Sequence, residues 1–183
     1  MSHNLGALFF PEKAATPIKL LVLDVDGVLT DGGLYYDLQN QVMKRFDVQD
    51  GLGIKIAMKN GITVAVITGL KSKAVEARMC DLKIEDYHAG FLDKRDCLRC
   101  IQEKYGLDWS EIAYLGDDWV DLSVMSMVGL PLAVANAQPE VKKSALYVTT
   151  AHGGRGAVRE VIRLLLMAQG KYEAALAAWT GPC

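Results

Sequence analysis

Short apolar runs recur along the chain and are separated by mixed segments. "IKLLVLD" at 18–24 leads to Gly27, and "ITVAVITG" at 62–69 has the same character. Continuous runs of this length, rich in Val, Ile and Leu, predict strands buried on both faces. Four further strands are predicted at 86–90, 111–118, 130–136 and 146–150.

Helical patterns lie between these runs, several of them ending at glycine. They are predicted at 51–61, 71–82, 93–106, 119–129, 138–145 and 154–170. Nearly all-apolar strands that alternate with helices are typical of a parallel sheet covered on both faces. We therefore expect a Rossmann-like α/β fold.

Residues 33–48 differ, because two β-prone runs flank "DLQNQ" and predict a β-hairpin. Residues 28–67 hold only this hairpin and one helix, which leaves no room for a cap domain. We expect one compact domain over 1–183, with a leader at 1–17 and a C-terminal tail at 171–183.

Charge and composition narrow the function classes. The net charge is −2 with both signs mixed, which gives no case for binding nucleic acid or an anionic membrane. The apolar runs are shorter than a membrane span, and the first residues do not resemble a secretion signal. Cys97 and Cys100 form a lone C-x-x-C in a predicted helix, so reduced thiols in a cytoplasmic protein are expected.

Polar groups follow four of the predicted strands. Ligands of parallel sheets bind at the carboxyl ends of the strands, so these groups should meet at one edge. They are Asp24 and Asp26, Thr68 and Gly69, Lys94, and the acids Asp117, Asp118 and Asp121. Oxygen ligands without His or Cys favour a hard cation such as Mg²⁺. A metal, a carboxylate nucleophile and a lysine together indicate phosphoryl transfer.

Four segments resemble the motifs of the haloacid dehalogenase-like phosphatases, in the same order: "DVDGVLTDG", "ITG", Lys94 and "GDDWVD". The longer stretches "LDVDGVLTDGGLYYD" and "GGRGAVREVIRLLLMAQG" are similar to the small cap-less branch that contains the 3-deoxy-D-manno-octulosonate 8-phosphate phosphatases. The resemblance runs from about residue 18 to residue 170 and implies a Mg²⁺-dependent phosphatase of lipopolysaccharide biosynthesis.

The resemblance also implies roles. Asp24 would attack phosphorus and become an aspartyl-phosphate, and Asp26 would act as general acid and then base. Asp24, the Asp26 carbonyl and Asp117 would bind the metal. Thr68 would donate a hydrogen bond to a phosphoryl oxygen, Gly69 would bind the substrate, and Lys94 would offset the charge of Asp24 and the phosphate. Asp118 and Asp121 would hold metal-bound water or the loop, although both could simply cap a helix.

Other functions stay open. A phosphorelay receiver uses similar residues, but its paired acids follow the first strand, whereas here they come late. A non-catalytic assembly module, like the domain fused to some acylneuraminate cytidylyltransferases, is argued against by the complete set of motifs. The substrate is expected to be octulosonate 8-phosphate, with a sialic-type nonulosonate 9-phosphate as the alternative. Leu70 stands where relatives carry Arg or Glu, so this specificity marker is missing.

The carboxylate of a sugar-acid substrate needs a bidentate hydrogen-bond donor, and the guanidinium group of arginine is one. Arg78 is the first candidate and Arg155, in the "GGRG" loop, the second. The hairpin at 33–48 is too apolar for a solvated flap, so a homotetramer with hairpins at subunit contacts is expected. His88 and His152 have no assigned role.

Overall fold

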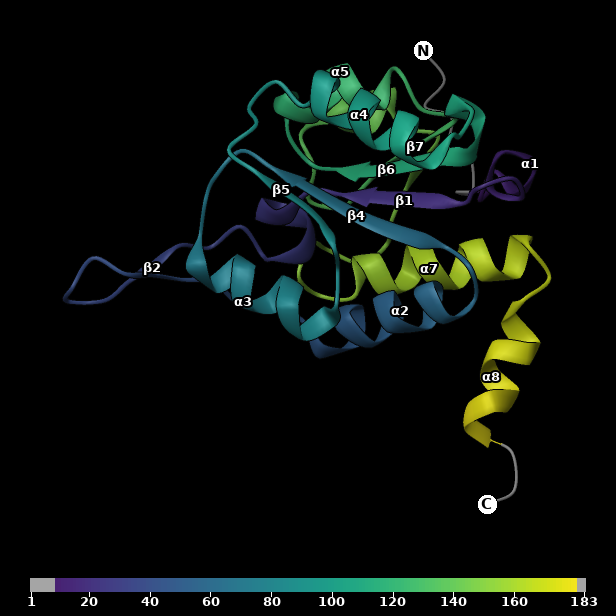
Figure 1. Ribbon diagram of the computed structural model, residues 1–183, viewed down its shortest axis with the longest axis horizontal. Coiled ribbons are helices and arrows are strands. Elements are labelled where there is room, and N and C mark those ends of the chain that lie inside the picture. Colours follow the sequence, from purple (N-terminus) through teal and green to yellow (C-terminus); the bar gives the residue numbers. More distant parts are fainter. Residues whose placement is uncertain (1–8, 181–183) are drawn as a thin grey trace, which may run out of the picture.

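The computed structural model describes residues 9–180, which form one six-stranded parallel sheet and a separate hairpin (Figure 1). The strand order β5-β4-β1-β6-β7-β8 places β1 in the interior of the sheet. The strands are β1 Leu20–Leu23, β4 Thr63–Thr68, β5 Asp86–Ala89, β6 Ile112–Gly116, β7 Leu130–Ala133 and β8 Tyr147–Val148. The parallel sheet expected from the apolar runs is confirmed.

Helices cover both faces of the sheet. On one face lie α2 Val48–Lys59, α3 Lys73–Leu82 and α7 Ala157–Ala168, with α2 packed along α7. On the other lie α4 Arg95–Tyr105 and α5 Leu122–Met125, and α6 Pro139–Ser144 packs on α5 and β7. Within residues 9–180, each helix is too short or too polar to traverse a bilayer.

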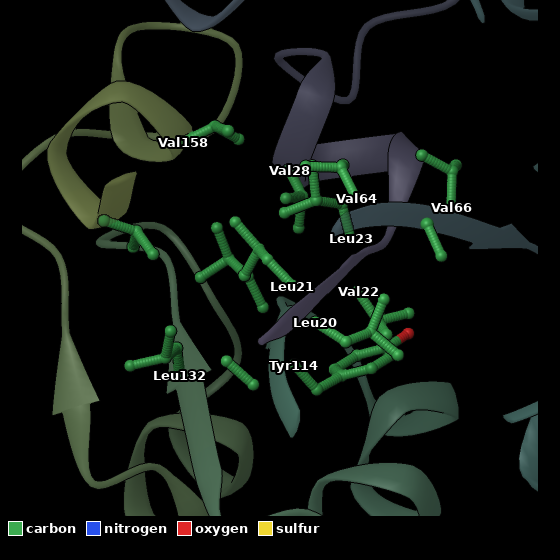
Figure 2. Packing of buried hydrophobic residues seen from close by; sticks show 14 of the residues in the cluster. Leu20, Leu21, Val22, Leu23, Val28, Val64, Val66, Tyr114, Leu132 and Val158 are labelled. Carbon is green, nitrogen blue, oxygen red and sulfur yellow. The ribbon is translucent and has the colours of Figure 1, made fainter. Parts of the chain in front are cut away.

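The strand β1 is the centre of the hydrophobic core. All four of its residues are fully buried between β4 and β6, where Leu23 pairs with Val66 on one side and Leu115 on the other. Figure 2 shows these side chains packed against residues of β4, β6 and β7. Burial on both faces explains why this strand is apolar throughout, and it holds the residues that follow it at the middle of the sheet edge.

Three segments differ from the sequence expectation. The helix expected at 119–129 is a 3₁₀ turn, Trp119–Asp121, followed by α5, which ends at Met125. At Gly129, where this helix was expected to end, the backbone lies so close to Ser110 that a Cβ on Gly129 would be 2.6 Å from Ser110 Cα. The chain enters β7 directly after this residue. The leader and the tail contain helices that were not predicted, α1 Glu12–Ala15 and α8 Tyr172–Thr180.

The hairpin is present, with short strands β2 Tyr35–Tyr36 and β3 Val42–Met43, and it projects from the body (Figure 1). Residues 1–8 of the predicted leader and residues 181–183 of the predicted tail lie outside the described residues. The single domain over 1–183 therefore stays a prediction.

Candidate active site

The loop after β1 carries the first two acids. Asp24 continues the strand direction with ψ near 170°, and a distorted helical turn follows at Val25–Leu29. Gly27 has φ +88°, and a Cβ there would lie 2.0 Å from the Asp117 carboxylate. Only glycine combines this backbone conformation with that close approach, so Gly27 lets Asp117 lie directly against the loop.

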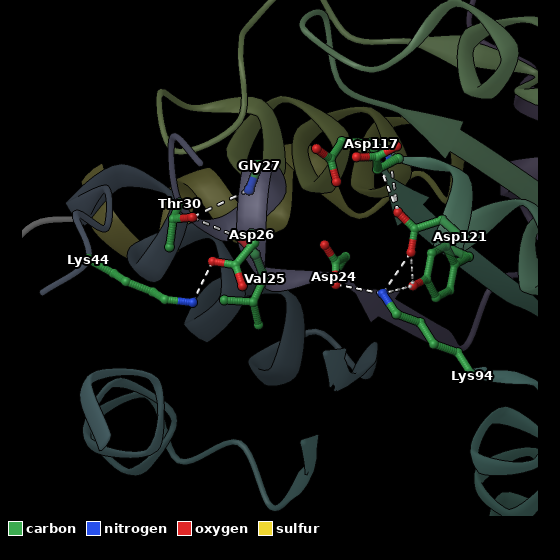
Figure 3. Close-up of polar contacts among 11 residues, drawn as sticks. Asp24, Val25, Asp26, Gly27, Thr30, Lys44, Lys94, Asp117 and Asp121 are labelled. Atoms are coloured by element: carbon green, nitrogen blue, oxygen red, sulfur yellow. Dashed lines mark hydrogen bonds and ion pairs between the residues drawn. The ribbon is translucent and has the colours of Figure 1, made fainter. Parts of the chain in front are cut away.

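Lys94 joins three of the four strand ends. Its ammonium nitrogen lies 2.6 Å from Asp24 Oδ1, 2.7 Å from Asp121 Oδ1 and 3.1 Å from the Tyr114 hydroxyl (Figure 3). The Lys94 side chain is fully buried. A buried ammonium is stable only when paired, and here two carboxylates and a hydroxyl occupy its donors.

Asp121 is fully engaged by its surroundings. Oδ1 accepts bonds from Lys94 and from Tyr114, whereas Oδ2 accepts bonds from the backbone N–H groups of Asp117 (2.9 Å) and Asp118 (3.3 Å). Asp118 itself is exposed and caps the 3₁₀ turn by accepting from Trp119 N–H. Asp121 therefore holds both the loop and Lys94 in place.

Asp117 is the acid with spare coordination capacity. Its Oδ1 is buried and has no hydrogen-bond partner among residues 9–180. Oxygens of Asp24, Asp117 and Asp121 lie within 4.8 Å of one another. Since Asp121 is already saturated, Asp24 and Asp117 remain as the pair able to hold a hard cation such as Mg²⁺. The orphaned oxygen of Asp117 is the observation that this ion would explain.

The electrostatics also favour a cation. Burial raises the pKa of Asp24 to about 6, with Lys94 opposing a further rise. Burial, followed by the charges of Asp24 and Asp121, raises the pKa of Asp117 to about 8. Burial alone would lower the pKa of Lys94, but Asp24 and Asp121 outweigh it and leave that pKa raised. One lysine is thus insufficient for three acids, and a divalent ion would stabilise the ionised carboxylates.

Asp26 has a different partner from Asp24. Lys44, from the end of the hairpin, places its Nζ 2.5 Å from Asp26 Oδ1, and Figure 3 shows Lys44 and Lys94 approaching this loop from opposite sides. Neither Lys44 nor Tyr114 was among the predicted site residues. Tyr114 sits inside an apolar strand and gives no signal of its own, and Lys44 lies in a segment expected to contact another subunit.

Thr68 ends β4 beside β1 and is 1% exposed. Its carbonyl accepts from the N–H groups of Gly90 and Phe91, which ties the end of β4 to the loop that leads to Lys94. Gly69 follows at the same edge, where a Cβ would lie 3.1 Å from Leu92 Cδ2. The structure therefore brings Thr68 and Gly69 to the sheet edge that carries Asp24.

The "GGRG" loop closes over the first loop. A Cβ on Gly153 would lie 1.6 Å from the Gly27 carbonyl oxygen, and Gly154 N–H donates to Val28 O at 2.8 Å. Asp50 fastens this loop by accepting from the N–H groups of Gly156 and Arg159. The loop is thus packed, backbone against backbone, on the turn that follows Asp24.

The two candidate arginines occupy different surroundings. Arg155 is exposed and lines a cavity of about 330 Å³ together with Asp31, Asn136 and His152. Arg78 donates to the Asp47 carbonyl at 3.2 Å and lies over the Phe46 ring, 5.8 Å from its centroid. Arg78 is therefore engaged at the start of α2 and is not brought into the carboxylate cluster.

The sequence matches a known protein family and is similar to a known phosphatase. Residues 87–162 match the model of a family described as haloacid dehalogenase-like hydrolase. Over 161 residues the chain is 47% identical to the 3-deoxy-D-manno-octulosonate 8-phosphate phosphatase KdsC of Escherichia coli K12. The aligned region covers 88% of this chain and 86% of that protein.

Solved structures are similar over nearly the whole chain. The Moraxella catarrhalis 3-deoxy-D-manno-octulosonate 8-phosphate phosphatase, in complex with magnesium, phosphate and KDO, matches with a TM-score of 0.89 and 39% identity, covering 92% of this chain and 97% of that one. The cobalt-bound Haemophilus influenzae phosphatase YrbI matches with a TM-score of 0.85 and 41% identity, covering 88% and 94%.

Proposed function

Because this chain belongs to the 3-deoxy-D-manno-octulosonate 8-phosphate phosphatase family of haloacid dehalogenase-like hydrolases, we propose that it removes the phosphate from this sugar acid phosphate with the help of Mg²⁺. The observation that carries the proposal is the buried cluster in which Lys94 pairs with Asp24 while an Asp117 oxygen stays without a partner among residues 9–180. That cluster supplies a nucleophile, a positive charge and an oxygen ligand at one point.

The chemistry divides between the two acids of the first loop. Asp24 attacks phosphorus and carries the phosphoryl group, while Lys94 balances the negative charge that gathers there. Asp26 gives a proton to the departing sugar oxygen and later takes one from the attacking water. Thr68 donates a hydrogen bond to a phosphoryl oxygen, and Gly69 contacts the substrate. Mg²⁺, held by Asp24, Asp117 and the Asp26 carbonyl, would supply charge neutralisation of the phosphate.

Release of inorganic phosphate from 3-deoxy-D-manno-octulosonate 8-phosphate tests this function directly. We expect turnover with Mg²⁺, loss of turnover in excess chelator and recovery when Mg²⁺ is restored. A nonulosonate 9-phosphate and glucose 6-phosphate serve as comparison substrates. Equal turnover of the hexose phosphate would reject the sugar-acid assignment, and full activity in chelator would reject the metal.

Recognition of the sugar carboxylate is proposed for Arg155 ahead of Arg78, because the first is exposed at a cavity and the second is already bound to α2. Loss of a charge-assisted hydrogen bond costs about 1.5–3 kcal/mol, so Arg155→Ala is expected to raise KM for the sugar acid phosphate by about 10- to 100-fold. KM for 4-nitrophenyl phosphate, which has no carboxylate, should stay unchanged.

Steady-state kinetics on both substrates check this expectation, with Arg163→Ala, an exposed arginine of α7, as the matched control. Arg78→Ala is expected to lower the melting temperature and to leave KM for the sugar acid phosphate nearly unchanged. A selective KM increase in Arg78→Ala, and none in Arg155→Ala, would reverse the assignment.

Assembly as a homotetramer in the cytoplasm is proposed as the working state. The hairpin supports the assembly, because Tyr35, Tyr36 and Met43 are all more than half exposed on an element that projects from the body. The free thiols Cys80, Cys97 and Cys100 support the reducing compartment. Light scattering at assay concentration is expected to give the mass of four chains, and an active monomer would contradict it.

A further inference from the structure

The base of the hairpin is fixed to the body at two neighbouring residues. Lys44 reaches Asp26, whereas Arg45 donates to the Gly154 carbonyl at 2.5 Å. In an extended chain successive side chains point to opposite sides. Lys44 therefore contacts the loop after β1, and Arg45 contacts the "GGRG" loop. An isolated antiparallel β-bridge between the backbones of Thr30 and Phe46 also joins the hairpin base to the loop after β1.

Lys44 differs from the rest of the hairpin in its burial. Its side chain is 2% exposed, although Met43 beside it is 55% exposed. Moving an ammonium out of water is costly unless a charged partner compensates, and the partner here is the Asp26 carboxylate. The ion pair with Asp26 therefore compensates for the removal of the Lys44 ammonium from water.

Asp26 is constrained by this contact in a specific way. Lys44 occupies Oδ1, while the Asp26 side chain remains 29% exposed. Oδ2 is therefore the oxygen left for an incoming substrate. Because Asp26 lies two residues after Asp24, an oxygen fixed in this way has a defined relation to the phosphoryl group on Asp24.

We propose that Lys44 is a positioning residue for Asp26: it holds Oδ1 so that Oδ2 alone exchanges the proton during catalysis. The inference rests on the proposed function of Asp26. In the first half-reaction the Asp24–phosphorus bond forms, the phosphorus–sugar oxygen bond breaks, and the sugar oxygen takes the proton of Asp26. In the second, water attacks phosphorus, the Asp24–phosphorus bond breaks, and a water proton returns to Asp26.

The effect of Lys44 substitution on substrates with different leaving groups distinguishes a positioning role from a purely structural attachment of the hairpin. A sugar alkoxide needs a proton to depart, whereas 4-nitrophenolate leaves without one. General acid–base assistance contributes about 10²–10⁴-fold, so imperfect positioning in Lys44→Met should lower kcat/KM for the sugar acid phosphate on the order of 10- to 100-fold. For 4-nitrophenyl phosphate, kcat/KM should change by less than about threefold, because it reports only the steps up to release of 4-nitrophenolate. The kcat also includes hydrolysis of the aspartyl-phosphate, which both substrates share and in which Asp26 acts as base.

A double-variant cycle with Asp26→Asn shows whether Lys44 acts through Asp26. If it does, Lys44→Met combined with Asp26→Asn should be about as slow as Asp26→Asn alone. Lys44→Arg, which keeps the charge and a donor, should restore most of the activity. Lys55→Met, which removes an exposed lysine of α2, is the control for loss of charge. Thermal unfolding of each variant checks the fold, and Lys44→Gln replaces Lys44→Met if the latter does not fold.

Wild-type kcat/KM for the sugar acid phosphate in the Lys44 variant, equal losses of kcat/KM on the two substrates, or losses that multiply in the double variant would each overturn the proposal. An increase in KM with kcat unchanged would also overturn it, since Lys44 would then bind substrate directly. A wild-type chain without activity on the sugar acid phosphate would instead reject the proposed function, so the two failures are distinguishable.

Discussion

The Asp24→Asn protein is expected to stay folded and to lose turnover by at least about 10⁴-fold, the scale seen when a covalent nucleophile is removed. An amide cannot form the phosphoryl intermediate at a useful rate. The fold should survive because Asp24 is a buried acid whose ionisation is opposed by burial, and Lys94 keeps Asp121 as a partner at 2.7 Å. The substitution changes the chemistry while it preserves the shape of the side chain.

Two measurements check this result. Phosphate release gives the loss of kcat, and beryllium fluoride, a mimic of an aspartyl-phosphate, should raise the melting temperature of the wild type but not of Asp24→Asn. Asp81→Asn, on the exposed side of α3, is the matched control and should behave as wild type in both. Substantial turnover in Asp24→Asn would mean that another residue, or water, attacks phosphorus.

Lys94→Met is expected to harm activity and stability together. Removing one partner of a buried ion pair costs about 3–5 kcal/mol of unfolding free energy, because Asp24 and Asp121 are left buried without their cation. Loss of a preorganised charge at the reacting group costs a further 2–4 kcal/mol, about 30- to 1,000-fold, in kcat/KM. The two effects have different origins and can be separated.

The separating variant is Lys94→Met combined with Asp121→Asn. It removes one of the two uncompensated charges, so urea denaturation should show part of the stability restored, whereas kcat/KM should remain low. If activity recovers with stability, Lys94 serves only to support the fold. A loss of less than tenfold in Lys94→Met would lead to the same conclusion.

The convergence of Asp24, Lys94, Asp117 and Asp121 could be predicted because two strong signals combine. Apolar runs identify parallel strands, and a parallel sheet brings the residues after its strands to one edge. The motif resemblance then suggested the family, which the 47% identical relative confirms. Neither signal depends on the detailed packing of side chains.

Contacts between distant segments could not be predicted in the same way. The hydrogen bond from Arg78 to the carbonyl of Asp47, 31 residues earlier, joins α3 to the start of α2 and has no signal in the sequence. The link between Lys44 and Asp26 depends on how the hairpin folds back, which no local periodicity encodes. The helix α8, "YEAALAAWT", could not be predicted from its position, because it follows Gly170, which signals the end of the preceding helix.

The central position of β1 sets the order in which the molecule can be completed during synthesis. β1 and the Asp24 loop leave the ribosome early, but their neighbours β4 and β6 follow only at Thr63 and Ile112, and the glycines that seal the loop arrive at Gly153 and Gly154. Contacts so far apart in sequence form slowly. A nascent chain that stops before residue 153 therefore leaves β1 exposed and lacks the glycines that pack against the Asp24 loop. We expect activity to appear only after residues 153 and 154 have emerged, and the shorter nascent chain to depend on protection against aggregation until then.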